Sequence, residues 1–224
     1  MKRIVLFVEG EGESDAVPRL IKRLLSEQNA WDAVNLDPDP FRVGEVNKLV
    51  KDGNREWKRK LAACLKRRNI GGVLLVLDGD VKKVGTKVFC AAEMAKALAG
   101  EAAAVGGGAK FSVAVVFARQ EFESWLIAGV ESCAGKRLPD GRLIAPNAKA
   151  PVGNLEENPR NAKGWFDKVV EGGYKPTRDQ AAVTELVALD AIRDRKLRSF
   201  NRLESALAEL VSAIRNNKYL VSPS

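Results

Sequence analysis

The 224-residue chain contains no histidine, and this absence removes several kinds of active site. Without an imidazole there is no Ser-His-Asp or Cys-His nucleophilic site, no histidine-ligated zinc centre and no nuclease of the HNH type. Acid–base or metal chemistry in this protein must therefore depend on carboxylates, lysines, arginines or water.

Cysteines and long apolar runs are scarce as well. Cys64, Cys90 and Cys133 are odd in number and contain no Cys-x-x-Cys pair, so we expect reduced thiols in a cytoplasmic protein. The first apolar run, residues 4–8, ends at Glu9 and is too short for a signal peptide or a membrane span. We therefore expect no association with a membrane.

Positive charge, by contrast, is in excess. Lysine and arginine number 37 against 29 acidic residues, a formal net charge of +8. A basic surface favours anionic partners, with nucleic acid first among them, unless the surplus only keeps the protein in solution. The same two interpretations apply to one basic cluster, which is either solvated surface or a grip on a phosphate backbone: Arg193, Arg195, Lys196, Arg198 and Arg202.

Three continuous apolar runs predict the fold. Residues 4–8, 73–77 and 111–117 are typical of strands buried on both faces, as inside a parallel sheet. Amphipathic helical patterns lie between them, and strand–helix–strand units of this kind produce parallel strands with helices packed outside. We therefore predict an α/β fold with a mostly parallel sheet and helices at 14–28, 54–68 and 84–98. Because Pro18 is tolerated only near a first turn, the first of these helices is expected to start as late as Val17.

The second part of the chain has a different pattern. Residues 136–159 are rich in Gly, Pro and Asn and predict a long loop. Helices are expected afterwards, and Thr177 with Gln180 has the spacing of a capping box at the start of one of them. We predict an α/β domain at 1–135 and, at 136–224, a loop plus a helical extension with a frayed tail; the expected helices are 165–170, 177–189 and 200–214.

Acidic residues follow each of the three predicted strands. Glu9 follows the first strand, Asp78 and Asp80 the second, and Glu121 and Glu123 the third. Because the carboxyl ends of parallel strands meet at one edge of a sheet, we expect these carboxylates to converge. So many like charges require a cation, and ligands that are all oxygen suit Mg²⁺ or Mn²⁺. The alternative is that each acid only caps the helix that follows it.

The order of these acids resembles the TOPRIM domain of topoisomerases, bacterial primases and overcoming-lysogenisation-defect (OLD) nucleases. That pattern places a Glu, often followed by Gly, after the first strand and an Asp-x-Asp after a later one, matched here by Glu9-Gly10 and Asp78-Gly79-Asp80. A bacterial TOPRIM-like family of unknown function is similar over nearly the whole chain. Its V-E-G-x-T-E, E-F-E-x-W and C-terminal segments resemble residues 8–13, where Gly12 replaces Thr, and then 121–125, 174–180 and 199–203. The resemblance implies a TOPRIM-like, Rossmann-like fold.

The resulting hypothesis is divalent-metal-dependent hydrolysis of phosphodiester bonds in DNA or RNA. Asp78 and Asp80 would bind the metal, and Glu9 would bind it or act as general acid or base. Glu121 and Glu123 would complete a second metal position, whereas Glu11 and Glu13 are less favoured ligands. Weaker phosphate contacts are assigned to Arg119, Lys82 and Lys83. Such families are often encoded beside ATPases in phage-defence loci, so the resemblance implies an ATPase partner.

Other functions stay open at this point. In one, the acidic edge is degenerate and the protein is a non-catalytic TOPRIM-like subunit that binds nucleic acid or an ATPase. In another, the protein is a receiver-type phosphotransfer domain, although Lys82 stands where that pattern has a threonine. Dinucleotide binding is not predicted, because Asp15 stands where the third glycine of a Gly-x-Gly-x-x-Gly motif would lie.

Overall fold

A computed structural model describes residues 1–224 and contains one central parallel sheet. The strands follow the order β2-β1-β4-β7-β8, with β3 pairing farther along β1, and every one of these pairings is parallel. The predicted α/β fold with a mostly parallel, Rossmann-like sheet is therefore confirmed. The strand bounds are β1 Lys2–Val8, β2 Val34–Leu36, β3 Phe41–Arg42, β4 Ile70–Asp78, β7 Ser112–Ala118 and β8 Val221–Ser222.

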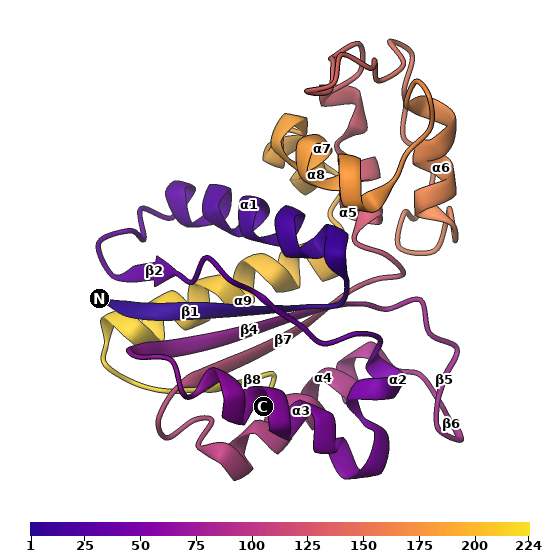
Figure 1. The fold of residues 1–224 in the computed structure, drawn as a ribbon. Coiled ribbons are helices and arrows are strands. Elements are labelled where there is room, and N and C mark those ends of the chain that lie inside the picture. Colours follow the sequence, from indigo (N-terminus) through magenta and orange to yellow (C-terminus); the bar gives the residue numbers. More distant parts are fainter.

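Both faces of the sheet are buried, which explains the continuous apolar runs. In β1, Ile4 and Leu6 pack into one hydrophobic cluster, whereas Val5 and Phe7 pack into another on the opposite face. Side chains alternate between the faces of a strand, so a strand covered on both sides needs apolar residues at every position. Figure 1 shows the two helical layers: α1 (Glu11–Glu27) and α9 (Arg198–Arg215) on one face, and α3 (Lys51–Cys64) and α4 (Ala91–Glu101) on the other.

A lobe of short helices stands over the carboxyl ends of the strands (Figure 1). It shares a hydrophobic core with the sheet, for example through the rings of Trp125 and Phe200, whose centroids lie 5.7 Å apart. The predicted long loop at 136–159 contains no helix or strand. The helices of this lobe are α5 Glu123–Ala128, α6 Ala162–Val169, α7 Ala181–Leu186 and α8 Leu189–Asp194.

The end of the chain returns to the sheet, and the prediction of a frayed tail is wrong. Helix α9 packs against β7 and β4, and β8 then pairs in parallel with β7, Val113 opposite Val221. The backbone N–H of Val113 donates to the carbonyl of Leu220 at 2.9 Å. The tail is ordered because it supplies hydrogen-bond partners that the outer edge of β7 would otherwise lack.

The first helix also starts earlier than predicted, at Glu11, so that Pro18 lies inside it. The backbone N–H of Gly10 donates to the carboxylate of Glu13 at 3.0 Å, and the Ser14 hydroxyl donates to the carbonyl of Gly10 at 2.9 Å. These contacts stabilise the first turn, and the helix tolerates the loss of the one backbone hydrogen bond that Pro18 cannot donate.

Two other predicted helices are divided differently in the structure. The segment expected as a helix over 84–98 begins with a hairpin, β5 Lys83–Val84 and β6 Lys87–Val88, and becomes helical only at Ala91. The helix expected over 177–189 is a single π-helical turn at 176–180 followed by α7. The proposed capping box is absent, since Lys175 and not Thr177 occupies the N-cap position and no side chain caps the turn. Gln180 is instead buried, for a reason that becomes clear at the site.

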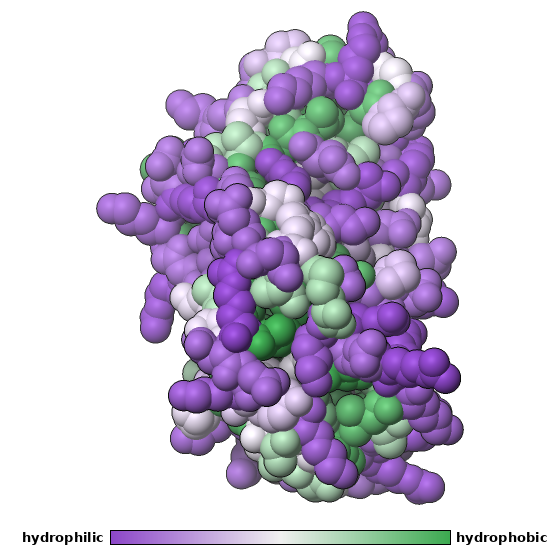
Figure 2. Space-filling view, turned by 90° about the vertical axis from the view of Figure 1, so that its left-hand side faces the viewer, coloured by the Kyte–Doolittle hydropathy of each residue, from purple (hydrophilic) through white to green (hydrophobic).

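The face of the molecule on which β1 begins is mainly hydrophilic, as Figure 2 shows. None of the helices combines the length and apolar character needed to cross a membrane. The cysteines are free thiols, two of them buried, and a short helix, α2 (Val46–Leu49), precedes α3.

Candidate metal centre

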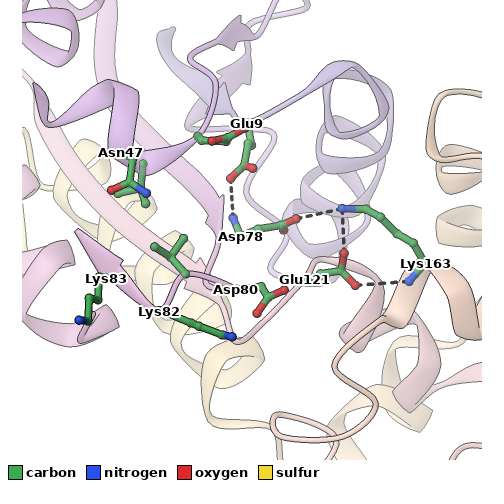
Figure 3. Close-up of a pocket in the computed structure, with 11 residues that line it drawn as sticks. Glu9, Asn47, Asp78, Asp80, Lys82, Lys83, Glu121 and Lys163 are labelled. Carbon is green, nitrogen blue, oxygen red and sulfur yellow. Dashed lines mark hydrogen bonds and ion pairs between the residues drawn. The ribbon is translucent and has the colours of Figure 1, made fainter. Parts of the chain in front are cut away.

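The acids that follow β1, β4 and β7 meet at the carboxyl edge of the sheet, as the parallel topology predicts. The backbone N–H of Asp78 donates to Oε2 of Glu9 at 3.2 Å, which joins the ends of β1 and β4. Oδ1 of Asp78 accepts the N–H of Phe122 at 2.8 Å, which joins β4 to the turn after β7. Figure 3 shows Glu9, Asp78 and Glu121 side by side in the cleft.

Gly79 allows the ends of β4 and β7 to approach so closely. Its N–H donates to the carbonyls of Ala118 and Gln120 at 2.8 and 2.7 Å. A Cβ atom at this position would lie 2.8 Å from the Ala118 carbonyl oxygen, too close for any side chain. The glycine of the Asp-Gly-Asp segment therefore holds the acidic turns against each other.

Three carboxylates form a compact cluster below the cleft. Oxygen atoms of Glu13, Asp78 and Glu123 lie within 4.8 Å of one another. The Gln180 side-chain amide donates to Glu13 and to Glu123, each at 3.0 Å, and the Tyr174 hydroxyl donates to Oε1 of Glu123 at 3.1 Å. Glu123 is fully buried, yet its Oε2 atom has no hydrogen-bond partner. A buried carboxylate oxygen that accepts no hydrogen bond is energetically unfavourable, and a bound ligand or a proton would relieve this cost.

Lys163, on α6, is the only basic side chain that reaches this cluster. Its Nζ lies 3.1 Å from Glu121, 3.3 Å from Asp78 and 3.9 Å from Oε2 of Glu123. Oε2 of Glu121 also accepts the backbone N–H of Ala162 at 2.7 Å, which anchors the start of α6 and so positions the lysine. Its side chain is 37% exposed and reaches in from the lobe (Figure 3).

One lysine does not balance the charge of the buried acids. Burial raises the pKa of Glu123 to about 7, against the opposing charge of Lys163. Burial likewise raises the pKa of Asp78 well above its ordinary value, and that of Glu9 is raised. Desolvation lowers the pKa of Lys163, but the charges of Asp78, Glu123 and Glu121 outweigh it and raise the pKa overall. A cluster of oxygen donors that still lacks positive charge is suited to a metal ion.

An open cleft of about 470 Å³ gives solvent access to this edge. Asp80 lies on its wall, exposed and without a hydrogen bond or ion pair, and is not one of the three clustered acids. Lys82 and Lys83 also line it, whereas Arg119 does not and instead donates to the carbonyl of Glu156 at 3.4 Å. The full lining is Glu9, Glu45, Val46, Asn47, Asp78, Asp80, Val81, Lys82, Lys83, Glu121 and Lys163.

Sequence reasoning missed several residues of this site. Glu13 was ranked below Glu9, yet it belongs to the compact cluster, and Lys163, Tyr174 and Gln180 had no assigned part in the site. A signal was present in two of the segments that carry the TOPRIM-like resemblance, residues 8–13 and 174–180. These segments contact each other, and a Cβ at Gly12 would lie 2.6 Å from Oε1 of Gln180.

Fold and site together define an α/β protein whose parallel sheet carries a buried carboxylate cluster at its carboxyl edge. Residues 8–208 match the family described as "Domain of unknown function (DUF4276)", and the chain belongs to that family. No curated protein and no solved structure matches the chain. The resemblance to TOPRIM domains and OLD nucleases stays a prediction.

Proposed function

We propose that this protein is a divalent-metal-dependent nuclease that hydrolyses phosphodiester bonds of DNA or RNA with Mg²⁺ or Mn²⁺. The observation that carries the proposal is the buried carboxylate of Glu123, whose Oε2 accepts no hydrogen bond and which has an oxygen within 4.8 Å of carboxylate oxygens of Glu13 and Asp78. The donors are all oxygen atoms, which is the set that these hard cations prefer.

Glu13, Asp78 and Glu123 would hold the ion, with Gln180 and Tyr174 fixing the carboxylates from behind. When bound, such an ion supplies charge stabilisation at a phosphate and lowers the pKa of a coordinated water. The sequence predicted Glu9, Asp78, Asp80, Glu121 and Glu123 as ligands; the proposed set keeps Asp78 and Glu123, adds Glu13 and leaves out the other three.

The chain's own residues would do the remaining work. Glu9 and Asp80 line the open cleft, so they are placed to accept or donate a proton beside a bound phosphate. Lys163 lies at the cleft wall with a partly exposed side chain, where its positive charge would offset charge that develops on the phosphate. Lys82 and Lys83 line the same cleft and would contact neighbouring phosphates.

Support for nucleic acid as the substrate comes from the basic composition and from the resemblance to TOPRIM domains. The resemblance alone suggests a phage-defence role and an ATPase partner. A copurification experiment with the ATPase encoded nearest to this protein would test that second suggestion.

The test of the proposed function is cleavage of plasmid DNA and of a long RNA in Mg²⁺, in Mn²⁺ and in EDTA. We expect cleavage only with metal, and a loss of at least about 100-fold in rate for Asp78→Asn and Glu123→Gln. Glu93→Gln is the matched control, because Glu93 is exposed on α4 and contacts neither cluster nor cleft. Equal cleavage in EDTA, or unchanged rates in the two site variants, would contradict the proposal.

One observation favours a second function, a non-catalytic subunit that binds nucleic acid or an ATPase. Lys163 already contacts three of the acids, so the cluster has an internal counter-ion. In that case neither Mg²⁺ nor Mn²⁺ would raise the melting temperature, whereas nucleic acid or the ATPase would still bind.

A further inference from the structure

Three of the five residues in the basic cluster of the C-terminal helices are neutralised by their own neighbours, whereas Lys196 and Arg198 are exposed and form no ion pair. Arg195 contacts Glu131 at 2.7 Å and Arg202 contacts Glu209 at 2.9 Å. Arg193 contacts three carboxylates, those of Glu27, Asp190 and Glu204. Arg193 holds α1, α8 and α9 together, and the three paired arginines have no charge left over for a phosphate backbone. Only Lys196 and Arg198 of this cluster remain free, fewer charges than lie beside the cleft.

A second group of basic residues lies beside the cleft and is nearly free of acidic partners. Lys82, Lys83 and Lys87 belong to the β5–β6 hairpin, are exposed, and form no ion pair. On α2 and α3, Lys51 and Arg55 are likewise exposed and unpaired, and Lys48 only reaches Glu45 at 4.0 Å. We name these six residues the basic rim.

The basic rim follows the side of the cleft that faces away from Lys163. In Figure 3, Asn47, Lys82 and Lys83 lie on that side and the acids on the other. The next residue after Asn47, Lys48, lines a second hollow of about 360 Å³ together with Lys51, Arg55 and Arg59, and two acids, Asp52 and Glu56, complete its walls. The positive charges therefore spread along one rim and do not converge on one point.

The hairpin is built into the fold although it adds little to the core. Phe89 packs edge-on against Phe117, with ring centroids 5.3 Å apart, and its N–H donates to the carbonyl of Lys82 at 3.1 Å. The two strands of the hairpin carry Lys83, Lys87 and the apolar Val88, which is 78% exposed and pairs with Lys83. Like charges on so short an element repel one another, and an anion bound beside them would relieve that repulsion.

We propose that the basic rim binds the phosphate backbone of a nucleic acid that lies across the mouth of the cleft. Spread positive charges fit an extended polyanion better than a small anion, for which the donors would converge. The exposed Val88 would contact sugars or bases, and the adjacent acids would receive one backbone phosphate only with a cation. The choice of nucleic acid rests on the proposed function, whereas the location of the surface rests on the structure.

The test measures binding of fluorescein-labelled single-stranded and duplex DNA, and of RNA, in EDTA over a series of salt concentrations. We expect each double variant, Lys83→Ala/Lys87→Ala and Lys51→Ala/Arg55→Ala, to bind about tenfold more weakly, with a log K against log salt slope shallower by about 1 to 2. Lys110→Ala/Lys218→Ala is the control, since both lysines are exposed near the amino ends of β7 and β8. Circular dichroism would verify folding.

Unchanged affinity and slope in both rim variants would overturn the inference, as would wild-type protein that binds no nucleic acid. Equal binding to poly-glutamate would assign the rim to acidic proteins and would also overturn it. Failure of the two proposals can be told apart. If the wild-type protein binds nucleic acid, the rim variants bind it more weakly and no protein cleaves it with metal, only the nuclease proposal is refuted. If the rim variants bind and cleave nucleic acid as well as the wild type does, only the rim proposal is refuted.

Discussion

The buried carboxylate of Asp179 and the buried cluster of Glu13, Asp78 and Glu123 have opposite electrostatic surroundings. Asp179 is 1% exposed and is held by Arg178 at 2.8 Å, by Arg142, and by the backbone N–H of Lys175 at 2.8 Å. Burial alone would raise its pKa, but the hydrogen bonds from Arg178 and Arg142 outweigh burial and lower the pKa. This carboxylate is fully paired and its role is to hold the loop against the lobe.

The cluster at the carboxyl edge of the sheet is as deeply buried but lacks such pairing. Glu123 is 0% exposed, its pKa is raised to about 7 by burial, and one of its oxygens accepts no hydrogen bond. Several carboxylates share the single ammonium group of Lys163. A buried charge therefore does not by itself indicate a functional site, whereas a buried charge that its neighbours compensate only in part does.

The largest expected difference between the two groups is in stability. Asp179→Ala leaves the guanidinium groups of Arg142 and Arg178 without their shared acceptor, so we expect a loss of about 3 kcal/mol in the free energy of unfolding. Asp140→Ala, which removes the exposed partner of the same Arg142, should have a far smaller effect. Urea denaturation would measure both variants. A smaller loss of stability for Asp179→Ala than for Asp140→Ala would show that the buried ion pairs of Asp179 do not stabilise the fold.

The pH dependence of stability should have opposite signs for the two groups. The folded-state pKa of Glu123 lies above its value in the unfolded chain, so the folded protein binds the extra proton. Stability should therefore fall by up to about 3 kcal/mol as pH rises from about 4.5 to 7. The pKa of Asp179 is lowered, so its contribution is instead lost as pH falls through and below its ordinary range near pH 4.

Urea denaturation across this pH range, in metal-free buffer, measures the effect. Glu123→Gln should reduce the fall in stability between pH 4.5 and 7 without abolishing it, because the pKa of Asp78 is raised as well. A variant with the unaltered wild-type pH profile would contradict the assigned origin.

Divalent metal should stabilise the protein through one group only. At a free Mg²⁺ or Mn²⁺ concentration 100 times the Kd, wild-type protein should gain about 2.7 kcal/mol in the free energy of unfolding. Glu123→Gln should lose this gain, whereas Asp179→Ala should keep it despite its lower starting stability. Melting temperatures with and without metal provide the measurement, and an equal gain in all three proteins would place the ion elsewhere.

The smallest expected effect concerns the internal counter-ion. Lys163→Met removes a charge that competes with a metal ion, so stability without metal should fall by about 1 kcal/mol. Metal affinity should rise by roughly tenfold, because the cluster becomes more negative by one charge. Lys168→Met is the control, an exposed lysine on the same helix without an ionic partner. Weaker metal binding by Lys163→Met would show that the lysine helps to hold the ion.

The comparison also shows which parts of the site were predictable. The positions of Glu9 and Asp78 were predictable, because each residue follows a buried apolar run and parallel strands bring their carboxyl ends together. The contact between Glu13 and Gln180 was not predictable, since Gln180 lies 167 residues further along the chain. The Thr177–Gln180 spacing suggested a capping box, whereas packing against Gly12 turned the Gln180 side chain into the core instead.

The sequence by itself determined the parallel sheet and the edge at which its acids gather, because the periodicity of a buried strand and the chemistry of its ending are local properties. Only the tertiary structure decided which carboxylates face one another, that Lys163 alone reaches them, and that the six residues of the basic rim gather along the hairpin and α2–α3. These features depend on how the helical lobe docks over the strand ends, and contacts between residues 85 to 167 positions apart leave no periodic trace in the chain.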